Sequence, residues 1–412
     1  MKANFLPSTI LVIIAIALAG AGCEKGDCKQ KHTIYVPVYK SLSEIRKSIK
    51  SEGPRRMEET GKIYLKGKYI LINEPNKGIH VIDNSQPRFP RKVSFIAIPG
   101  NVDMAVKDNI LYADSYSDLV TIDISNPQRT GSPKFLDDVF PYYRYQWSNS
   151  TNPDSIQILV DYTERDTIIS CQDTISIDIA TPDNMESFKN LSSSSVSVGG
   201  SMARYTVVND YLYTVTNSNL KVFDIADASA PSYKRTISLG WGIETLYPFK
   251  DKLFIGSTTG MFVYDITEPG WPKQLSRFSH ARSCDPVVAD DNYAYVTLRS
   301  GSFCAGTSNQ LDVLDVADVK APFLKQQYEM KNPHGLSKDG ELLFICDGTD
   351  GLKVYQTKNG YTLTLLQHIK GLETFDVITW NNTAFVIAKD GLHQYDYSNP
   401  ENIKKISKIS LN

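Results

Sequence analysis

The sequence predicts an all-β protein, a seven-bladed β-propeller, from a strand meander and from the regular repetition of that meander. The clearest meander is Asn101–Pro127. It contains three short runs of β-branched, aromatic or aliphatic residues, separated by turns rich in Asp, Asn, Ser and Pro: Val102–Val106, Ile110–Ala113 and Leu119–Ile124. One such meander cannot bury both of its faces, so it needs neighbours of the same kind.

The neighbours are marked by an apolar strand that ends in Asp and is usually followed by a Pro-containing turn. The marker positions are Asp83, Asp123, Asp224, Asp265, Asp315, Gln356 and Asp396. Four of the six gaps between them are 40 or 41 residues, and the other two are 50 and 101. The two longer gaps therefore contain insertions.

A fourth strand follows the turn after the marker. It is visible at Lys92–Ile98, at Tyr233–Leu239 and at Lys404–Leu411. A period of about 40 residues with four short strands is that of a propeller blade. A β-solenoid usually has a shorter period and no outer strand, so seven units favour seven blades.

The marker Asp has a structural interpretation. A carboxylate at a strand end can accept hydrogen bonds from backbone N–H groups of the following turn. Its recurrence argues for blade geometry and against seven active sites. Gln356 departs from the rule, and its unit has Thr-Lys-Asn-Gly in place of a Pro turn.

The N-terminus predicts a bacterial lipoprotein signal over residues 1–22, with Cys23 as the lipidated first residue. Lys2 supplies the positive end and Ile10–Ala21 the apolar core, which is too short for a permanent membrane span. Gly20 stands where the lipoprotein pattern usually has an aliphatic residue, and an ordinary secretory signal is the alternative. A lipid on Cys23 would hold the protein on a membrane.

Residues 23–56 are expected to form a tether and a short cap, and residues 57–412 the propeller. Leu42, Ile45 and Ile49 have helical spacing after Ser41 or Ser43, a plausible N-cap, and Gly53-Pro54 would stop the helix. Ile34–Tyr39 is a candidate extra strand on the propeller edge.

The largest insertion covers about 131–199. Its start, around Phe135–Phe140, belongs to the outer strand of the second blade. The rest predicts a projecting hairpin, made of Ser155–Tyr162 and Asp166–Ser170 with Thr163-Glu164-Arg165 between them. Long insertions on repeat scaffolds often carry partner contacts, although a solvated decoration fits equally well.

Beyond Cys23 the sequence has five cysteines, and disulfides are expected in an exported protein. Cys284 and Cys304 border loops of one blade, and we expect a disulfide between them. Cys346 lies within an apolar strand and is expected to be a buried small hydrophobe. Cys28 and Cys171 have no assigned role.

The most site-like set of residues lies where first strands begin, because these positions face one another across the mouth of a propeller channel. Aligning the units on their second strands places Glu244, Asp285 and His334 in neighbouring blades. Four further residues with polar or aromatic side chains lie close to that row in the sequence: Arg204, Trp241, His280 and Arg282.

One interpretation of this row is a polar pocket for a cation, a sugar or a peptide end. Two carboxylates and a histidine can also perform acid–base chemistry or bind a divalent metal. The structural alternative is that these charges are solvated or pair with Arg204 and Arg282. We assign no catalytic residue, metal or cofactor from the sequence.

Other signals exclude some classes of function. The 44 basic and 46 acidic residues are nearly balanced, so nothing indicates nucleic-acid binding. No nucleophile elbow, phosphate loop or HExxH motif is present. Asp347–Gly351 faintly resembles a calcium loop but lacks the distal Glu, so we expect a hairpin turn.

At this point the sequence resembles a known family. LVTIDISNP, LKVFDIADASAP, MFVYDITEPGWP and LDVLDVADVKAP resemble the LVIVD repeat. Longer stretches from about Pro37 to the end are similar to the LVIVD-repeat lipoproteins of Bacteroidetes-type bacteria. The resemblance implies a β-propeller carried by an outer-membrane lipoprotein, with no known reaction and no catalytic residues to transfer. Gln356 and Gly20 depart from the pattern.

The sequence thus predicts an outer-membrane lipoprotein that acts as a non-enzymatic binding propeller for an envelope protein or glycan. The alternative is a ligand-binding or hydrolase- or lyase-type pocket at the channel mouth. In the resembling group, an acidic stretch after the lipidated Cys can direct display on the cell exterior. Only Glu24 and Asp27 hint at one here, so the periplasmic and the cell-surface face both stay open.

Overall fold

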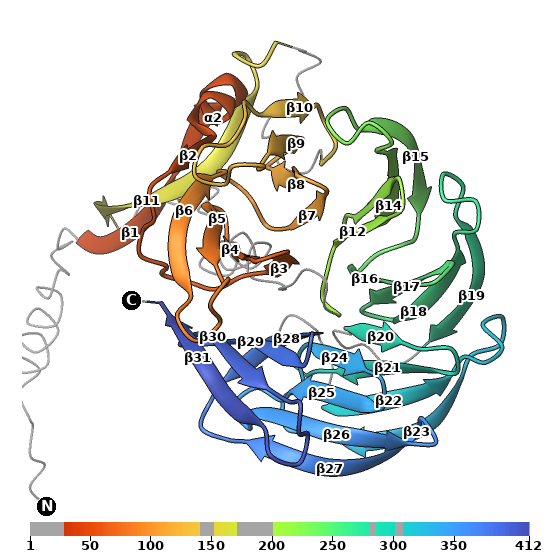
Figure 1. The fold of residues 1–412 in the computed structure, drawn as a ribbon. Coiled ribbons are helices and arrows are strands. Elements are labelled where there is room, and N and C mark those ends of the chain that lie inside the picture. Colours follow the sequence, from red (N-terminus) through yellow and green to blue (C-terminus); the bar gives the residue numbers. More distant parts are fainter. Residues whose placement is uncertain (1–28, 141–151, 171–200, 280–285, 301–307, 412) are drawn as a thin grey trace, which may run out of the picture. The chain divides into compact units, whose positions relative to one another are not determined.

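The computed structural model describes residues 29–140, 152–170, 201–279, 286–300 and 308–411. Seven antiparallel sheets follow one another along the chain and are arranged as the blades of a propeller (Figure 1). The predicted all-β, seven-bladed fold is therefore confirmed. The predicted signal over residues 1–22, with Cys23 and Cys28, lies outside the described residues. None of the helices in the described ranges has the length and apolar character needed to span a bilayer.

Each blade is a meander of four consecutive strands. Blade 1 contains β3 (Ile63–Lys66), β4 (Tyr69–Glu74), β5 (Gly78–Asp83) and β6 (Arg91–Ala97). Blade 2 contains β7 (Met104–Lys107), β8 (Ile110–Ser115), β9 (Asp118–Asp123) and β10 (Lys134–Leu136). Blade 3 contains β12 (Tyr205–Val208), β13 (Tyr211–Val215), β14 (Asn219–Asp224) and β15 (Ser232–Ser238). Blade 4 contains β16 (Ile243–Phe249), β17 (Lys252–Ser257), β18 (Gly260–Asp265) and β19 (Lys273–Ser279).

The remaining blades have the same order. Blade 5 contains β20 (Val287–Ala289), β21 (Tyr293–Leu298), β22 (Gln310–Asp315) and β23 (Phe323–Glu329). Blade 6 contains β24 (Leu336–Asp339), β25 (Leu342–Cys346), β26 (Leu352–Lys358) and β27 (Thr362–Ile369). Blade 7 contains β28 (Thr374–Trp380), β29 (Thr383–Ala388), β30 (Gly391–Asp396) and β31 (Lys404–Ser410).

This strand order creates two faces. Blade-to-blade connections and the turns between second and third strands lie on one face, which we call the connection face. Turns between first and second strands and loops between third and fourth strands lie on the other, which we call the loop face. Both long insertions leave and rejoin the propeller on the connection face, because one joins β10 to β12 and the other joins β21 to β22.

The marker Asp at the end of each third strand closes the following turn. In six blades its Oδ1 accepts a hydrogen bond from the backbone N–H two residues later, at 2.8–3.2 Å; the carboxylates are Asp83, Asp123, Asp224, Asp265, Asp315 and Asp396. The structural interpretation of the marker is confirmed. Gln356 lies inside β26, which continues for two residues beyond it.

Adjacent blades share apolar cores and are joined by tyrosine hydroxyls. One buried cluster combines Tyr213 and Val222 of blade 3 with Leu253 and Phe262 of blade 4. The second-strand tyrosines reach a loop-face carbonyl of the next blade. The Tyr213 hydroxyl donates to Pro269 O at 2.7 Å, and two tyrosines repeat this contact in other blades: Tyr112 to Ala228 O and Tyr295 to Gly360 O.

Side chains, with no shared strand, join the last blade to the first. Ile63 and Ile72 of blade 1 lie in one buried cluster with Ile387 and Leu392 of blade 7. The amides of Asn84 and Gln394 also exchange two hydrogen bonds, of 3.0 and 2.8 Å. Lys92 Nζ of blade 1 also donates to Ser410 O of blade 7 at 3.3 Å, so burial and side-chain hydrogen bonds close the ring.

A short helix covers part of the propeller. Helix α2 (Leu42–Ser48) begins at Ser41 with a capping box, in which Ser41 and Glu44 each accept the other's backbone N–H. Arg46 binds Asp118 at 2.7 Å and Asp137 at 2.6 Å. The predicted helix is confirmed, but it ends at Ser48, before Gly53-Pro54, because the chain continues into β2.

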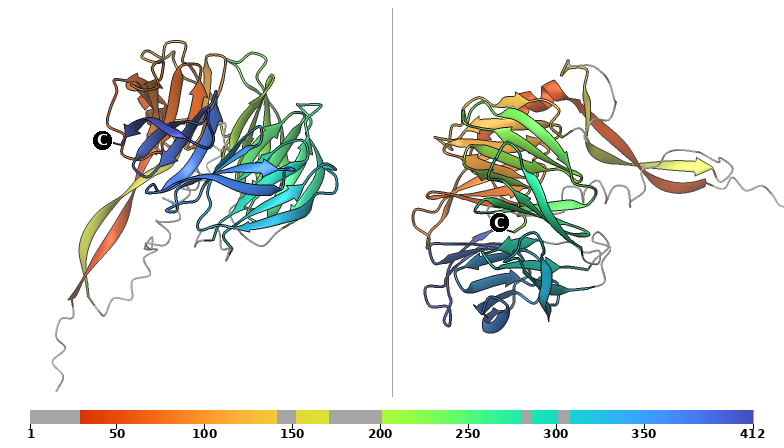
Figure 2. Two further views of the ribbon diagram at one scale, coloured as in Figure 1. Left: turned by 60° about the horizontal axis from the view of Figure 1, so that its bottom comes forward. Right: turned by 90° about the vertical axis from the view of Figure 1, so that its right-hand side faces the viewer.

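Two strand predictions outside the blades are wrong. The predicted hairpin over Ser155–Tyr162 and Asp166–Ser170 is a single strand, β11 (Gln157–Ser170), which pairs with β1 (Lys29–Ser41). Thr163-Glu164-Arg165 lacks the Gly or Asn that a tight hairpin turn requires, so the strand continues through it. Ile34–Tyr39 accordingly belongs to this two-stranded ribbon, seen in red and yellow in Figure 2.

The extra strand on a propeller edge lies elsewhere. It is β2 (Lys50–Glu52), which pairs with β6 and makes blade 1 five-stranded. The predicted outer strand of blade 2 is present as β10, and it pairs with β9 over three residues. Residues up to Leu136 therefore belong to the propeller, and the insertion starts after them.

The inter-blade tyrosine contact gives a first prediction. Tyr213→Phe leaves the Pro269 carbonyl without its donor and should lower the free energy of unfolding by about 1 kcal/mol. Urea titration measures this difference. Tyr233→Phe is the control, because Tyr233 is 52% exposed and its hydroxyl bonds to Thr236 of its own strand at 3.1 Å, with no partner in another blade among the described residues. Equal unfolding midpoints for the two variants would contradict the role of the contact.

Candidate functional site

The centre of the propeller is crossed by Ser201–Arg204, the end of the connection from blade 2 to blade 3, which we call the hub segment. Ser201 Oγ accepts the N–H of Leu336 in blade 6 at 2.8 Å. Met202 O accepts Lys62 Nζ of blade 1 at 3.5 Å, and Ala203 O accepts Leu246 N–H of blade 4 at 2.6 Å. The N–H of Arg204 donates to Asp103 of blade 2 at 2.7 Å. One short segment thus contacts four other blades.

A buried ion pair lies beside the hub segment. Lys62 Nζ is 2.7 Å from Asp103 Oδ2, and their side chains are 0% and 1% exposed. Burial lowers the pKa of Lys62 and raises the pKa of Asp103, while their mutual attraction opposes both shifts. Asp103 also accepts the N–H groups of Met104 and Arg204 at 2.7 Å each. The aspartate therefore has three donors and is fixed in one position.

A second carboxylate fixes the backbone that carries the first. Asp114 Oδ1 accepts the N–H groups of Val102 and Asp103 at 2.8 and 2.9 Å, and the side-chain amide of Asn101 at 2.9 Å. Burial raises the pKa of Asp114 to about 6, against the opposing effect of those backbone hydrogen bonds. This carboxylate also has a structural role.

Asp347 fixes the backbone before the first strand of blade 6 in a similar way. Its carboxylate accepts the N–H groups of Lys331 and Asn332 and also binds Lys353 Nζ, which lies 2.8 Å from Asp350. Asp347–Gly351 is a turn between β25 and β26, as predicted. A lysine ammonium lies between the two carboxylates of this turn.

Blades 4, 5 and 6 contribute a second polar group at the mouth. His334 Nε2 lies 3.4 Å from Arg299 Nη1 and 3.2 Å from Asn332 Nδ2. The Glu244 carboxylate acts on the same guanidinium, since its charge raises the pKa of Arg299 against the lowering caused by burial. Arg299 thus contacts the imidazole of His334 and feels the charge of the Glu244 carboxylate.

His334 is neutral in this environment. Burial first, and the charge of Arg299 second, lower the pKa of His334 to about 3. Arginine and the amide nitrogen of asparagine are donors, so Nε2 accepts and the ring proton lies on Nδ1. His334 O also accepts the hydroxyl of Thr297 at 2.6 Å, and its ring meets Phe375 edge-on at 5.4 Å. A histidine held this way does not exchange a proton near neutral pH.

The structure brings some of the predicted site residues together and separates others. Arg299 contacts His334 and is within electrostatic range of Glu244, whereas the backbone N–H of Arg204 donates to Asp103 and its guanidinium to Val215 O at 3.4 Å. Trp241 is 72% exposed. Several predicted residues lie outside the described residues, so their roles stay predictions: His280, Arg282, Asp285 and the cysteines Cys171, Cys284 and Cys304.

Sequence reasoning missed Asp103, Asp114 and Arg299. Arg299 follows β21, a second strand. The turns after second strands lie on the same face as the starts of first strands, so the strand order could have indicated that Arg299 lies at the mouth. Asp103 immediately follows the aligned position, Val102, and a shift of one residue would have found it.

Two further features of the described ranges limit the chemistry. No group of three His, Cys, Asp or Glu residues there is placed to hold a metal ion. Cys346 is a free, fully buried thiol in β25, as expected, and burial raises its pKa.

Comparison with known proteins identifies the repeat. The family model described as the LVIVD repeat matches three segments of this chain, residues 100–130, 199–237 and 281–330. The chain carries LVIVD repeats. These matches include strands of blades 2, 3 and 5. The other blades are assigned to the same repeat because they have the same marker position and the same strand order. No curated protein matches the sequence.

Solved structures show the same fold at low sequence identity. A protein from Lactobacillus plantarum has a TM-score of 0.54 at 12% identity, over 85% of this chain and 96% of that one. The computationally designed Ika8 protein has a TM-score of 0.51 at 10% identity, over 88% and 92%. PorZ, a surface component of the type-IX secretion system of Porphyromonas gingivalis, has a TM-score of 0.50 at 14% identity, over 87% of this chain and 39% of PorZ. At these identities the likeness concerns the fold alone.

The buried ion pair gives a second prediction. Lys62→Met leaves Asp103 buried without its cation and should destabilise the fold by roughly 3–5 kcal/mol, measured by urea unfolding. Lys62→Met combined with Asp103→Asn should recover part of that loss, because no charge is then left unpaired. Lys408→Met is the control, since its partner Asp390 is at the surface and the loss should stay below about 1 kcal/mol. A double variant as unstable as the single one would contradict this account.

His334 gives a third prediction, which concerns pH. The unfolded chain protonates this histidine below its ordinary pKa of 6.5, whereas the folded chain does so only near 3. Stability from this residue is therefore present above pH 6.5 and is lost as the pH falls toward 3. Between pH 7 and pH 4 the loss is roughly 3 kcal/mol.

Comparing variants isolates this effect from other titrating groups. His334→Gln should lose less stability than the wild type between pH 7 and pH 4, measured by urea unfolding at both values. His32→Gln, at an exposed histidine, should follow the wild type. Parallel pH profiles for the wild type and His334→Gln would show that the ring is not held neutral.

Proposed function

We propose that this protein is a cell-envelope lipoprotein, anchored in the outer membrane through Cys23, whose propeller is a non-enzymatic binding module for an envelope protein or glycan. The N-terminal sequence supports the anchor, through Lys2, the apolar run Ile10–Ala21 and the small residues before Cys23. The resemblance to LVIVD-repeat lipoproteins of Bacteroidetes-type bacteria supports the placement in the envelope. Both the periplasmic and the cell-surface side agree with these features.

One observation carries the preference for binding over catalysis: the ionisable groups at the channel mouth are bonded within the fold. Lys62 and Asp103 pair with each other, and Asp114 accepts three donors from residues 101–103. His334 is held neutral by burial and by Arg299. General acid–base catalysis needs a group whose pKa lies near the working pH and that can also reach a substrate, whereas Asp114, with its pKa raised to about 6, is only 7% exposed. The described mouth residues serve as a scaffold instead.

The ribbon of β1 and β11 is the element best suited to a partner. Its strands are 13 and 14 residues long, and a two-stranded sheet has two open edges. Isolated two-stranded ribbons are only marginally stable in water, so added contacts would stabilise this one. Ile168 is 69% exposed and Val36 is 36% exposed on it. We therefore assign partner contact to the ribbon.

A deletion tests this assignment and gives a fourth prediction. Residues 160–187 are replaced by a short Gly/Ser linker, which keeps the buried Ile156, Ile158 and Leu159. Cross-linking in intact cells followed by purification should recover a partner with the wild type and not with this variant. Thermal unfolding of the propeller should be unchanged.

The control is Leu365→Ser, which removes a 48% exposed apolar side chain from blade 6 and should retain the partner. Recovery of the same partner with the 160–187 replacement would refute the assignment to the ribbon. Loss of the partner with both variants would place the contact on the blades.

A second candidate function is a small-ligand pocket at the channel mouth. The observation that favours it is the convergence of Glu244, Arg299 and His334 from three blades. Arginine with a neutral imidazole and an amide suits a carboxylate or a sugar hydroxyl. A small molecule that stays bound during purification, detected by native mass spectrometry and absent from Arg299→Ala, would favour this candidate.

A further inference from the structure

The loop face of blade 1 differs in charge from the same face of other blades. Its first turn (Lys66–Tyr69) and its third-to-fourth loop (Asp83–Lys92) carry five basic side chains and one acidic one, a net charge of +4. The equivalent segments of blade 3 (208–211 and 224–233) and of blade 5 (289–293 and 315–324) each have a net charge of −3. The positive charge is therefore local, although the whole chain has a formal net charge of −2.

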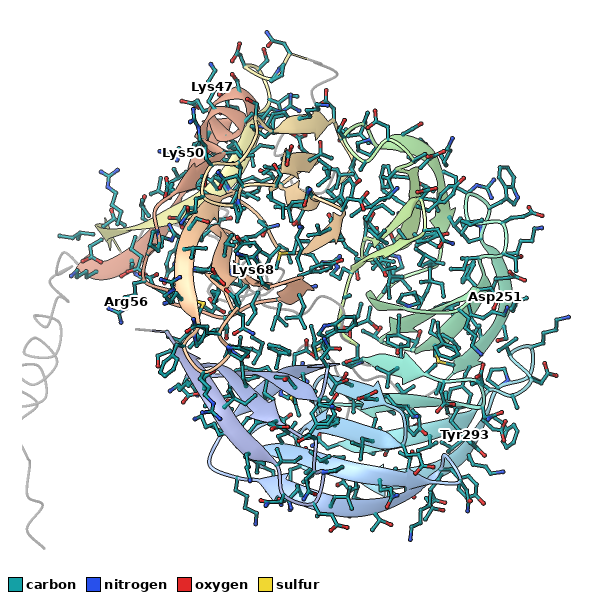
Figure 3. All side chains as sticks on the ribbon, in the orientation of Figure 1. Lys47, Lys50, Arg56, Lys68, Asp251 and Tyr293 are labelled. Atoms are coloured by element: carbon teal, nitrogen blue, oxygen red, sulfur yellow. The ribbon has the colours of Figure 1, made fainter. Side chains whose placement is uncertain are left out.

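These cations are available to a partner. Lys68, Arg88 and Arg91 are exposed, and within the described ranges none of them forms an ion pair. Lys66 and Lys92 each donate one hydrogen bond, to Asn109 at 2.8 Å and to Ser410 O at 3.3 Å. Figure 3 labels Lys68 on this blade.

An exposed aromatic side chain lies among the cations. Phe89 is 72% exposed and stands between Arg88 and Pro90. Its backbone N–H donates to Gln86 O at 2.8 Å, and Asn84 N–H donates to Lys68 O at 2.8 Å, which ties this loop to the first turn. The loop is thus a short, hydrogen-bonded turn that exposes an apolar side chain next to Arg88 and two residues before Arg91.

We propose that the loop face of blade 1 docks on an anionic lipid surface. Guanidinium and ammonium groups bind lipid phosphates, and an apolar side chain beside them enters the interface between headgroups and acyl chains. Nucleic acid is the other phosphate-rich polymer, but single-strand binding uses several aromatic side chains, and Phe89 is the only aromatic residue in the loop Asp83–Lys92. The acidic blades 3 and 5 restrict the contact to one side of the face.

This docking goes beyond the proposed lipid anchor, because it needs no modification of Cys23. It would give the protein a second, charge-dependent contact with a membrane. A basic patch beside a lipid anchor is a common second membrane signal.

Vesicle binding tests the docking and gives the fifth prediction. Every protein is the full chain with Cys23→Ser, so that no acyl chain contributes and residues 10–21 contribute equally. The wild-type sequence should bind vesicles with about 30% phosphatidylglycerol much more tightly than phosphatidylcholine vesicles, and about 0.5 M salt should abolish the difference. Arg88→Ser with Arg91→Ser should weaken binding to the anionic vesicles about tenfold or more. Phe89→Ser should weaken it several-fold.

Trp271→Ser is the matched control. Trp271 is 57% exposed in the equivalent loop of blade 4, and its replacement should leave vesicle binding unchanged. Equal binding to both vesicle types, or equal effects of Phe89→Ser and Trp271→Ser, would overturn the proposal. Binding of the wild type to single-stranded DNA in place of vesicles, lost in the double arginine variant, would also overturn it. Thermal unfolding of each variant shows whether the fold is intact.

Discussion

The polar contacts at the centre of the ring are the constraint on which the rest of the structure depends. A buried lysine and a buried aspartate are costly to desolvate, and they are tolerated only when each has partners. Lys62 and Asp103 pair at 2.7 Å, and Asp103 is held by two backbone N–H groups as well. The hub segment Ser201–Arg204 adds hydrogen bonds to four other blades. Because one segment touches so many blades, their relative positions are set from the centre as well as by the cores between neighbours.

This constraint also limits the chemistry of the channel mouth. In many enzymes, buried ionisable groups near a channel are catalytic candidates because burial shifts their pKa values. Here the same shifts have structural causes. Asp114 has a raised pKa and still accepts three donors from residues 101–103, and His334 has a lowered pKa beside Arg299. Burial causes these pKa shifts, and the hydrogen bonds to each group show that the fold holds it in place, which is why we propose function on the ribbon and the loops.

Local features of the sequence predicted much of the fold. Contacts between segments far apart in the sequence could not be predicted from it. The marker Asp acts within two residues of itself, so its spacing revealed the blades and their number. The partner of β11 lies more than a hundred residues away, and nothing near Thr163 indicated that β1 would supply it. The position of Glu244 and His334 at one mouth followed from the repeat, because equivalent positions face one another. Arg299, which lies beside His334, follows a second strand, and the aligned row considered only the positions where first strands begin.

Function in a repeat protein is expected where one unit departs from the others, because features shared by every blade serve the fold. The marker Asp places a carboxylate on the loop face of six blades. In blade 1 that carboxylate, Asp83, is outnumbered by five basic side chains around Phe89. Neither the turn nor the strand pairing requires those cations, since blades 3 and 5 form the same turns with acidic residues. The fold does not need this positive charge, which lies beside an exposed aromatic ring. We therefore attribute it to a contact with a partner outside the protein.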